Sequence, residues 1–293
     1  MTVEMRAAAA ARLKHQPPER KEQEVPRMTD GASARMPNVA RIYDFLLGGK
    51  ENNEEDRRAA EQLLEAVPDA AVAAWDNREF LGRAVRFLAA EAGIRQFLDI
   101  GTGLPTRGNV HSIAQQIAPD ARVAYVDNDP VVVLHARALL RKQPNVLVIE
   151  GDLRDPGEIL ASPALRAFIN FDEPAGVLLV AVLHFLRDVD NPRDAVSKLK
   201  DAMAPGSFLV LSHVTGDDLP PEATKRARTL YEQATAPGTA RTRREILRFF
   251  NGLNLVRPGL VNVASWRADW MEAEPGRTIF YAGVGVKTAG QGG

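Results

Sequence analysis

The spacing of apolar positions along the chain changes at Gly93. Before this glycine, residues 37–92 show the three- and four-residue spacing of helices, with Val39, Ile42 and Leu46 on one face. After it, short runs rich in Val, Ile and Leu alternate with helical stretches. The predicted strands are residues 96–100, 122–127, 145–150, 176–182, 207–213, 255–263 and 279–286. The predicted helices that follow the first five strands are residues 110–118, 131–140, 158–168, 193–203 and 243–253.

This alternation of strand and helix predicts an α/β fold. Strands joined by helices pair in parallel through right-handed crossovers, which builds a doubly wound sheet. The segment between the last two strands, residues 264–278, is polar and contains two tryptophans, which favours a hairpin over a crossover helix. We therefore expect five parallel strands followed by an antiparallel hairpin at one edge. Ligands of such sheets bind beyond the carboxyl ends of the strands.

Four further segments flank or interrupt the predicted core, residues 93–287. Residues 1–35 contain three prolines, many charges and no aromatic residue, so we expect a disordered tail. Residues 36–92 form a predicted helical arm, and the break at Gly48-Gly49-Lys50 indicates either a lid over the site or a plain helix end. Residues 217–242 are a predicted insertion, and residues 288–293 a flexible end.

Composition and charge exclude several functions. The chain has 293 residues, of which 45% are apolar, so it can bury a full core. Its 37 basic and 38 acidic residues give a net charge of −1, which provides no bulk attraction to nucleic acid or to a membrane surface. The absence of cysteine excludes disulfides and thiolate metal sites. The longest apolar run, residues 177–183, is too short to span a membrane, so we expect a cytoplasmic protein.

A glycine-containing turn follows the first predicted strand. It reads DIGTGLPTRGN from Asp99 to Asn109, and glycines at a strand end let a ligand approach the backbone closely. A dinucleotide fingerprint starting at Gly101 would need Gly or Ala where Thr106 stands. A phosphate loop starting at Gly103 would need Lys where Asn109 stands. The turn therefore matches neither of these nucleotide motifs.

Acidic residues gather where the first three predicted strands end. Asp99 lies two residues before Gly101, Asp127 ends the second strand, and Asp152 follows the third. S-adenosylmethionine carries two cationic groups, a ribose diol and an adenine amino group, and all of these are favoured by nearby carboxylates. A phosphate ligand would be repelled by the same three acids. Each acid also has a plainer interpretation. Asp99 could cap the turn, and Asp152 could pair with Arg154 alone. Either Asp127 or Asp129 could only cap the next helix, and Asp129 is the better candidate for this cap.

The chain resembles a family of S-adenosylmethionine-dependent methyltransferases that was formerly known as a domain of unknown function. The resemblance is carried by NVARIYDFLLGGKENNEEDR, NREFLGRAVRFLA, QFLDIGTGLPTRGNVH, VAYVDNDPVVVLHARALL, EGDLRDP and LLVAVLHFL, and it extends over residues 37–286. It implies a Rossmann-like sheet of seven strands with an antiparallel C-terminal hairpin, and S-adenosyl-L-methionine as cofactor. Pro105 departs from the usual glycine and lacks an N–H, which leaves the binding of the cofactor carboxylate open.

The resemblance also implies roles for individual residues. Gly101, Thr102 and Gly103 would line the methionine part of the cofactor, with Asp99 beside them. Asp127 would bind the ribose hydroxyls and Asn128 would lie beside the adenine. Asp152 and Leu153 would meet the adenine edge. The positions are those of the quoted motifs.

His184 follows the fourth predicted strand, where methyltransferases bring the acceptor to the methyl group. It is the candidate catalytic base, although a histidine there is more often a plain wall residue, and the same holds for His213. Oxygen ligands for magnesium could be imagined at Asp188, Asp190 and Asn191, but the neighbouring arginines favour a solvated loop, and we expect no metal. The basic residues of the insertion favour either an anionic acceptor or a solvated face.

The leading hypothesis is a methyltransferase that acts on an unidentified small-molecule acceptor by in-line transfer. Such a reaction depends mainly on alignment of the two reactants in a dry pocket. The alternative is a non-catalytic cofactor-binding sensor or partner module, which would use the same cofactor residues. A nicotinamide-dependent oxidoreductase is disfavoured by Thr106. Methylation of nucleic acid is disfavoured because no Asn/Asp-Pro-Pro-aromatic motif follows the fourth strand, and the sequence leaves the oligomeric state open.

Overall fold

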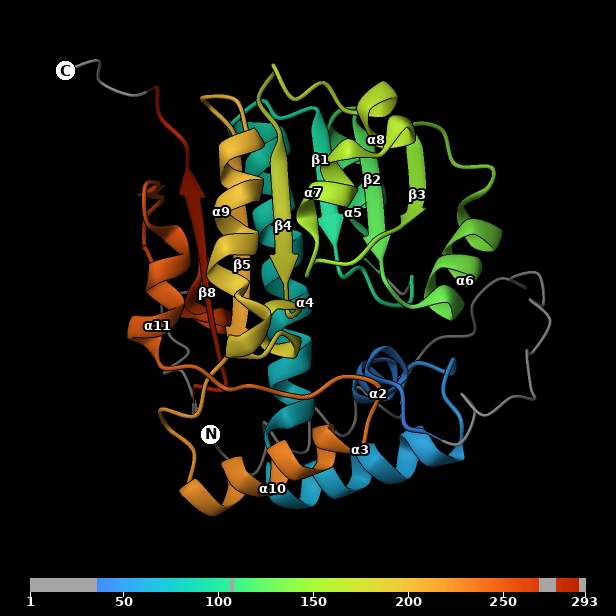
Figure 1. The fold of residues 1–293 in the computed structure, drawn as a ribbon, viewed down its shortest axis with the longest axis vertical. Helices are drawn as coiled ribbons and strands as arrows, with labels where there is room; N and C mark the ends of the chain where they lie inside the picture. The colour runs from blue at the N-terminus through green and yellow to red at the C-terminus, as the bar shows by residue number, and fades with distance from the viewer. Residues whose placement is uncertain (1–35, 106–107, 269–277, 290–293) are drawn as a thin grey trace.

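The computed structural model describes residues 36–105, 108–268 and 278–289. Its centre is a sheet with the strand order β3-β2-β1-β4-β5-β8-β6, in which β7 also pairs with β8 (Figure 1). The strands are β1 (Gln96–Ile100), β2 (Arg122–Asp127), β3 (Val146–Glu150), β4 (Gly176–Val180), β5 (Phe208–Val214), β6 (Asn254–Leu255), β7 (Val261–Asn262) and β8 (Phe280–Val286). Strands β1 to β5 are parallel, whereas β8 is antiparallel to β5. The predicted α/β fold with an antiparallel C-terminal part is confirmed.

The prediction of one continuous strand at residues 255–263 is wrong. The structure has β6 and β7 instead, and both pair with β8, so the sheet contains eight strand segments rather than seven. The chain leaves the ladder between them because Pro258 has no N–H to donate and Gly259 adopts a φ of 95°. The predicted tail, Thr106, residues 269–277 of the predicted hairpin excursion and residues 290–293 lie outside the described residues.

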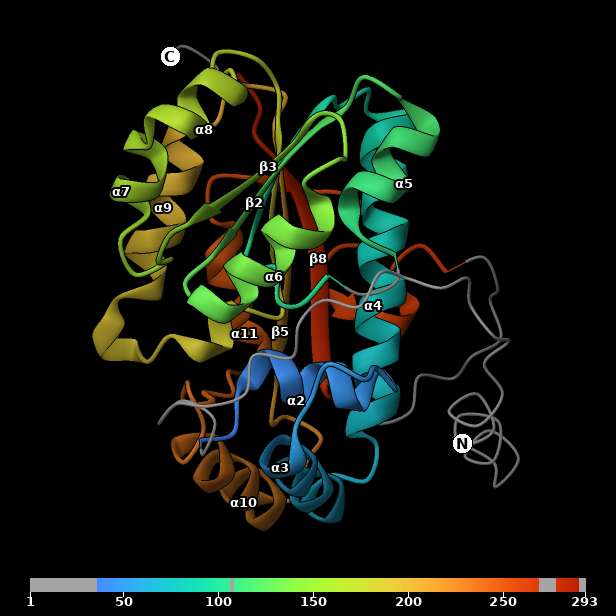
Figure 2. The ribbon, with the colours of Figure 1, turned by 90° about the vertical axis from the view of Figure 1, so that its right-hand side faces the viewer.

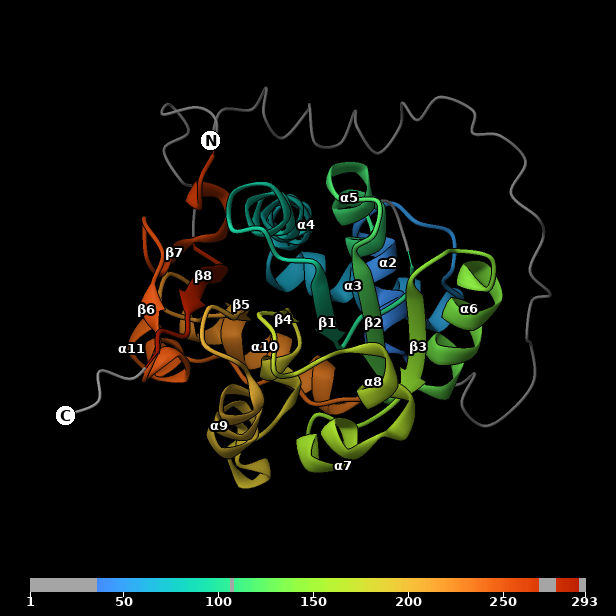
Figure 3. The same ribbon diagram turned by 90° about the horizontal axis from the view of Figure 1, so that it is seen from above.

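Helices cover both faces of the sheet (Figure 3). One face packs against α4 (Ala70–Arg86), α5 (Val110–Ile117) and α6 (Pro130–Leu140), through strand residues such as Phe97 and Val123. The other face packs against α7 (Pro156–Ala161), α8 (Pro163–Phe168), α9 (Pro192–Ala202) and α11 (Arg243–Leu247), through residues such as Leu98 and Ala124. Neighbouring strand residues thus enter opposite cores, as the two-residue repeat of a strand requires.

Two predicted helices are not continuous in the structure. The predicted helix at residues 158–168 is two helices, because Ser162 accepts a hydrogen bond from Leu165 N and starts α8 with Pro163 at its first position. Proline in a continuous helix would remove a backbone hydrogen bond. The predicted helix at residues 243–253 ends at Leu247 and continues only as a 3-10 turn to Phe250.

The N-terminal helices lie across the carboxyl ends of the parallel strands. They are α2 (Val39–Leu46) and α3 (Glu54–Ala66), and α3 packs beside α10 (Pro221–Glu232) (Figures 1 and 2). Buried Asp56 joins α3 to the start of α2, because its carboxylate accepts from Asn38 N at 2.8 Å and from Arg41 Nε at 2.6 Å. Asn38 in turn donates a side-chain hydrogen bond to Asp129, which begins α6. These helices are therefore anchored to the sheet at the site described below.

No helix in the described ranges is both long and apolar enough to cross a membrane.

Candidate functional site

A cavity of about 850 Å³ lies between the carboxyl ends of the parallel strands and the helices α2, α3, α4 and α10. Its volume is in the usual range of small-molecule sites. All nine site residues predicted from the sequence contribute to its wall: Asp99, Gly101, Thr102, Gly103, Asp127, Asn128, Asp152, Leu153 and His184. The fold thus brings together residues that are up to 85 positions apart.

The glycine turn after β1 forms the floor of this cavity. Gly101 has a φ of 74° and Gly103 a φ of 63°, values that glycine adopts without strain. A Cβ on Gly101 would lie 2.2 Å from a methyl carbon of Val182, so no larger residue fits. Gly101 N also donates to Val126 O at 2.8 Å. The turn is therefore held tightly between the ends of β2 and β4.

Asp127 closes one side of the turn. Its Oδ2 accepts from Gly103 N at 2.9 Å and its Oδ1 accepts from Asp129 N at 3.0 Å. Burial raises the pKa of Asp127, while these backbone hydrogen bonds lower it. The carboxylate thus lies at a fixed position on the wall of the cavity. There it can accept hydrogen bonds from the hydroxyl groups of a ligand.

Asp99 is buried beside the turn and lies in the field of Arg78. Burial raises the pKa of Asp99 to about 7, Arg78 lowers it, and Asp127 raises it further. Arg78 comes from α4 and donates to Asn109 Oδ1 at 3.0 Å. The sequence did not reveal Arg78 as a site residue, because nothing in the spacing of α4 indicates which of its polar positions reaches the glycine turn. The Arg78 guanidinium is thus a cation close to the segment that contains Pro105, a residue without a backbone N–H.

Asp152, Asn128 and Leu153 lie together at another part of the wall. Partial burial raises the pKa of Asp152, but hydrogen bonds from Arg154 lower it, and a hydrogen bond from Asn128 lowers it by a smaller amount. The pKa of Asp152 is therefore below its usual value. The pair with Arg154 that the sequence left open is thus present, and both residues line the cavity. Leu153 is 4% exposed and contributes an apolar surface. A carboxylate beside an apolar surface suits the edge and face of a nucleobase.

The turn after β4 is strained and is held by a buried polar network. Ala181 has a φ of 55°, which is unfavourable for a residue with a Cβ. Its N–H donates to Ser212 Oγ at 3.0 Å, and the Ser212 hydroxyl donates to Asn77 Oδ1 at 2.5 Å. Asn77 Nδ2 donates to the Tyr43 hydroxyl at 2.8 Å. The network thus connects β5, α4 and α2 around the centre of the cavity.

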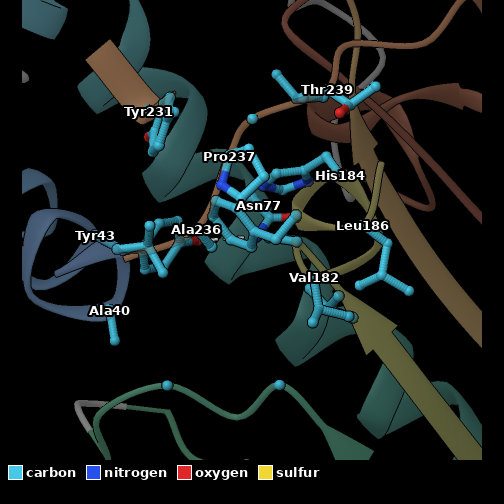
Figure 4. A pocket seen from close by; sticks show the side chains of 18 of the residues that line it. Ala40, Tyr43, Asn77, Val182, His184, Leu186, Tyr231, Ala236, Pro237 and Thr239 are labelled. Carbon is cyan, nitrogen blue, oxygen red and sulfur yellow. Dashed lines mark hydrogen bonds between the residues drawn. The ribbon is translucent and has the colours of Figure 1, made fainter. Parts of the chain in front are cut away.

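His184 lies on the cavity wall just beyond this turn (Figure 4). It is 7% exposed, its Nδ1 is buried without a hydrogen-bond partner, and no described residue bonds its other ring nitrogen. Burial lowers the pKa of His184 well below its usual value, and His213 and Arg241 lower it further. The imidazole is therefore neutral at neutral pH and can accept a hydrogen bond from a ligand.

His213 has a different environment from His184. It is fully buried, its Nδ1 donates to Val214 O at 2.7 Å, and its Nε2 accepts from Arg241 Nη1 at 2.9 Å. Arg241 also donates to the carbonyls of Leu183 and Leu186. His213 does not line the cavity, and it acts with Arg241 to hold the segment around His184.

The two carboxylates considered as magnesium ligands are bonded to arginines in the structure. Asp188 is bound by Arg241 and Asp190 by Arg187. Among the described residues, no group of three or more His, Asp or Glu side chains could hold a metal ion. Lys50 is exposed and does not line the cavity, while Gly48 and Gly49 donate to carbonyls of the last turn of α2. The break in the arm is therefore a helix end.

Of the six basic residues in the predicted insertion and directly after it, five are exposed, and one of these five, Arg228, also lines the cavity. Lys225, Arg226, Arg228, Arg243 and Arg244 are exposed. Arg241 is the exception, because its guanidinium is buried and bonded to the protein.

Comparisons with known proteins agree with the fold. A family model described as S-adenosyl methyltransferase matches residues 27–288. A protein from Thermobifida fusca YX that is proposed to be a methyltransferase is 46% identical, with a TM-score of 0.82 over 87% of this chain and 96% of that one. A DUF574 family protein from Streptomyces avermitilis MA-4680 is 38% identical, with a TM-score of 0.82 over 87% of this chain and 99% of that one.

More distant proteins share only the fold. The citrinin polyketide synthase CMeT domain is 14% identical, with a TM-score of 0.51 over 84% of this chain and 59% of that one. No curated protein matches the sequence. Because the family model spans most of the chain and both close structural relatives exceed a third in identity, the chain belongs to the S-adenosyl methyltransferase family, whose methyl donor is S-adenosylmethionine.

Proposed function

We propose that the protein transfers the methyl group of S-adenosylmethionine to a small-molecule acceptor by in-line displacement. The observation that carries this proposal is the continuity of one cavity, whose wall includes both the glycine turn with its carboxylates and His184. A donor held by the first part would direct its methyl group toward an acceptor held by the second. The sulfonium supplies the activated methyl group, so the protein mainly has to align the reactants and exclude water.

The residues on the donor side fit the chemistry of the cofactor. Gly103 leaves room for close approach of the methionine part, since a Cβ there would meet nothing within 4 Å, while Gly101 lets the turn pack against Val182. Asp127 presents a carboxylate for the ribose diol, and Asp99 adds negative charge near the ammonium group. Arg78 lies close enough to Asp99 to change its pKa, and we assign it to the methionine carboxylate. Asn128, Asp152 and Leu153 would surround the adenine.

On the acceptor side, we assign His184 as the group that orients the nucleophile. A neutral imidazole can accept a hydrogen bond from a hydroxyl or amine and take its proton as the carbon–nucleophile bond forms. The buried position of His184 keeps it uncharged, and its backbone is fixed because Thr239 N donates to His184 O at 2.7 Å. The strained turn at Ala181 lies between His184 and the donor side, which makes it the point where the two reactants meet.

Calorimetry with S-adenosylmethionine tests the proposal. The wild-type protein should bind the cofactor, and Asp127→Ala should weaken binding about 10-fold or more, since a hydrogen bond to a charged group contributes roughly 1.5 to 3 kcal/mol. Asp120→Ala is the matched control, because Asp120 is 79% exposed and pairs only loosely with Arg95 at 3.9 Å. Absence of binding by the wild type, or equal binding by both variants, would contradict the proposal.

Turnover separates the enzyme from a cofactor-binding module. The wild type should produce S-adenosylhomocysteine in the presence of an accepted substrate, and His184→Ala should reduce the rate without changing cofactor affinity. Cofactor binding with no transfer to any member of a broad panel of small hydroxyl and amine compounds would instead favour the non-catalytic alternative.

A further inference from the structure

We infer that the acceptor is a neutral, flat aromatic molecule that carries a hydroxyl group as its nucleophile. This inference rests on the proposed function, because it assigns a substrate class to the acceptor half of the same cavity. That half lies between α2, α4, α10, the turn after β4 and the connection between α10 and α11 (Figure 4). Three features of it carry the inference: its aromatic wall, its lack of unpaired charge and its unsatisfied imidazole.

A continuous row of aromatic rings lines this compartment. The Tyr231 ring lies 5.9 Å from Phe185, Phe185 lies 4.3 Å from His184, and His184 lies 5.8 Å from Phe280, measured between ring centroids. All four side chains belong to the cavity wall, and apolar side chains such as Leu186 and Pro237 complete it. Aromatic rings prefer stacked or edge-to-face contact with other rings, so a flat aromatic ligand gains most from this wall.

Three titratable side chains of the compartment, His184, Tyr43 and Tyr231, are uncharged at neutral pH. Burial lowers the pKa of His184 well below its usual value, and burial raises the pKa of Tyr43. Burial also raises the pKa of Tyr231 to about 12, with a further contribution from Tyr43. The compartment therefore contains polar groups without charge.

The charged side chains at the edge of the cavity have partners within the protein. Arg187 pairs with Asp190, and Arg228 pairs with Glu232. Asp44 is buried and accepts from Glu51 N and Asn52 Nδ2, each at 2.9 Å. An anionic acceptor would have to leave water and compete with Asp190 and Glu232 for these arginines, which is unfavourable. A neutral acceptor has no such cost.

His184 and Tyr231 provide the polar groups that such an acceptor would meet. In the described part of the chain, His184 Nδ1 is buried without a hydrogen-bond partner, and both His184 and Tyr231 line the cavity. A ligand hydroxyl can donate to the neutral imidazole, and the Tyr231 phenol can bond a second polar group of the same ligand. The hydroxyl oxygen then forms a bond to the methyl carbon while the carbon–sulfur bond breaks and its electron pair moves to sulfur. The hydroxyl proton passes to His184 and from there to solvent, leaving a methyl ether and S-adenosylhomocysteine.

The roof of the compartment limits the size of the acceptor. Thr235 N, in the connection after α10, donates to Pro37 O at 2.9 Å, and Val39 N donates to Thr235 Oγ1 at 3.1 Å. Thr239 in the same connection is bonded to the backbone of His184. The connection is thus fastened both to α2 and to the turn after β4. It covers the acceptor half, which favours a small molecule over a side chain of a folded protein or a nucleotide in a duplex.

Binding of three related probes to the protein saturated with S-adenosylhomocysteine tests the inference. The probes are 2-naphthol, the anion 2-naphthoate and 2-methoxynaphthalene, which lacks the hydroxyl donor. We expect 2-naphthol to bind at least about 10-fold more tightly than 2-naphthoate and about threefold more tightly than 2-methoxynaphthalene. With S-adenosylmethionine, mass spectrometry should detect 2-methoxynaphthalene as product.

Matched variants locate the binding. Tyr231→Phe and His184→Ala should each weaken 2-naphthol binding about threefold or more, with S-adenosylhomocysteine affinity unchanged. Tyr281→Phe is the control, since Tyr281 does not line the cavity and should leave both affinities unchanged. Equal or tighter binding of 2-naphthoate, or no binding of 2-naphthol to the loaded protein, would overturn the inference. Failure of S-adenosylhomocysteine itself to bind would instead overturn the proposed function.

Discussion

A Cβ on Gly101 would lie 2.2 Å from Val182 Cγ2, so the turn after β1 and the turn after β4 are in direct contact. Each turn belongs to a different half of the cavity. The glycine turn carries the groups assigned to the methyl donor, and the turn after β4 leads to His184. The distance between donor and acceptor is thus set by a contact that only glycine permits.

Gly101→Ala should destabilise the protein by about 2 to 5 kcal/mol, because it combines a left-handed backbone with a collision against Val182. Gly93→Ala is the matched control: Gly93 has a φ of 70°, but a Cβ there would meet nothing within 4 Å. It should cost only about 1 to 2 kcal/mol. Urea unfolding followed by circular dichroism measures both, and an equal loss in the two variants would show that the contact with Val182 is unimportant.

Asn77→Ala should destabilise the protein by about 1 to 3 kcal/mol, because the buried Ser212 hydroxyl loses its acceptor and the Tyr43 hydroxyl loses a donor. Gln233→Ala, at the exposed C-cap of α10, should change the free energy of unfolding by less than about 0.5 kcal/mol. Unfolding in urea provides the values. A double-mutant cycle with Ser212→Ala should show that the two losses are not additive, since both variants break one network; strict additivity would contradict it.

Arg241→Met should destabilise the protein by about 3 kcal/mol or more, since His213 Nε2 and the carbonyls of Leu183 and Leu186 lose their donor. Arg241→Lys should not restore stability, because a single ammonium cannot reproduce the planar fork. Arg228→Met removes an arginine of the exposed pair with Glu232 and should cost about 0.5 kcal/mol or less. Thermal unfolding compares the three variants, and full stability of Arg241→Lys would refute this account.

The sequence predicts most of the sheet because its strands carry the apolar runs of buried parallel strands. It fails where a proline interrupts an otherwise regular pattern. Pro163 divides a predicted helix into α7 and α8, and Pro258 separates β6 from β7. In both cases the apolar spacing continues across the proline, so the spacing alone predicts one element. The missing backbone N–H is what decides the outcome.

The donor side of the cavity could be predicted because its acidic residues follow the predicted strands directly. Asp99, Asp127 and Asp152 lie at or just beyond strand ends, and strand ends meet at one edge of a parallel sheet. Arg78 and Asn77 could not be identified in this way, because they lie within α4. Their contribution depends on how α4 packs across the sheet, which long-range contacts determine.

Asp99 makes the stability of the protein and its affinity for the cofactor depend on pH. Burial raises the pKa of Asp99 to about 7, against the opposing effect of Arg78, and Asp127 raises it further. The folded protein therefore holds a proton that the unfolded chain releases between about pH 4 and 7. Stability of the unliganded protein should consequently fall as pH rises through this window, and Asp99→Asn should reduce the slope. Thermal unfolding between pH 5 and 7 measures this change of stability with pH in both proteins.

Cofactor binding should show the opposite slope. The ammonium group of S-adenosylhomocysteine favours the ionised carboxylate, so affinity should rise with pH from 5.5 to 7, by at most about 10-fold per pH unit for one released proton. An α-amino group titrates at about 7.7 to 8.0, so it stays charged in this range. Calorimetry in buffers of different ionisation enthalpy measures how many protons are released when the cofactor binds. Methylthioadenosine, which lacks the amino acid part, and the Asp99→Asn variant should both lose this dependence; an unchanged slope in the variant would assign the proton to another group.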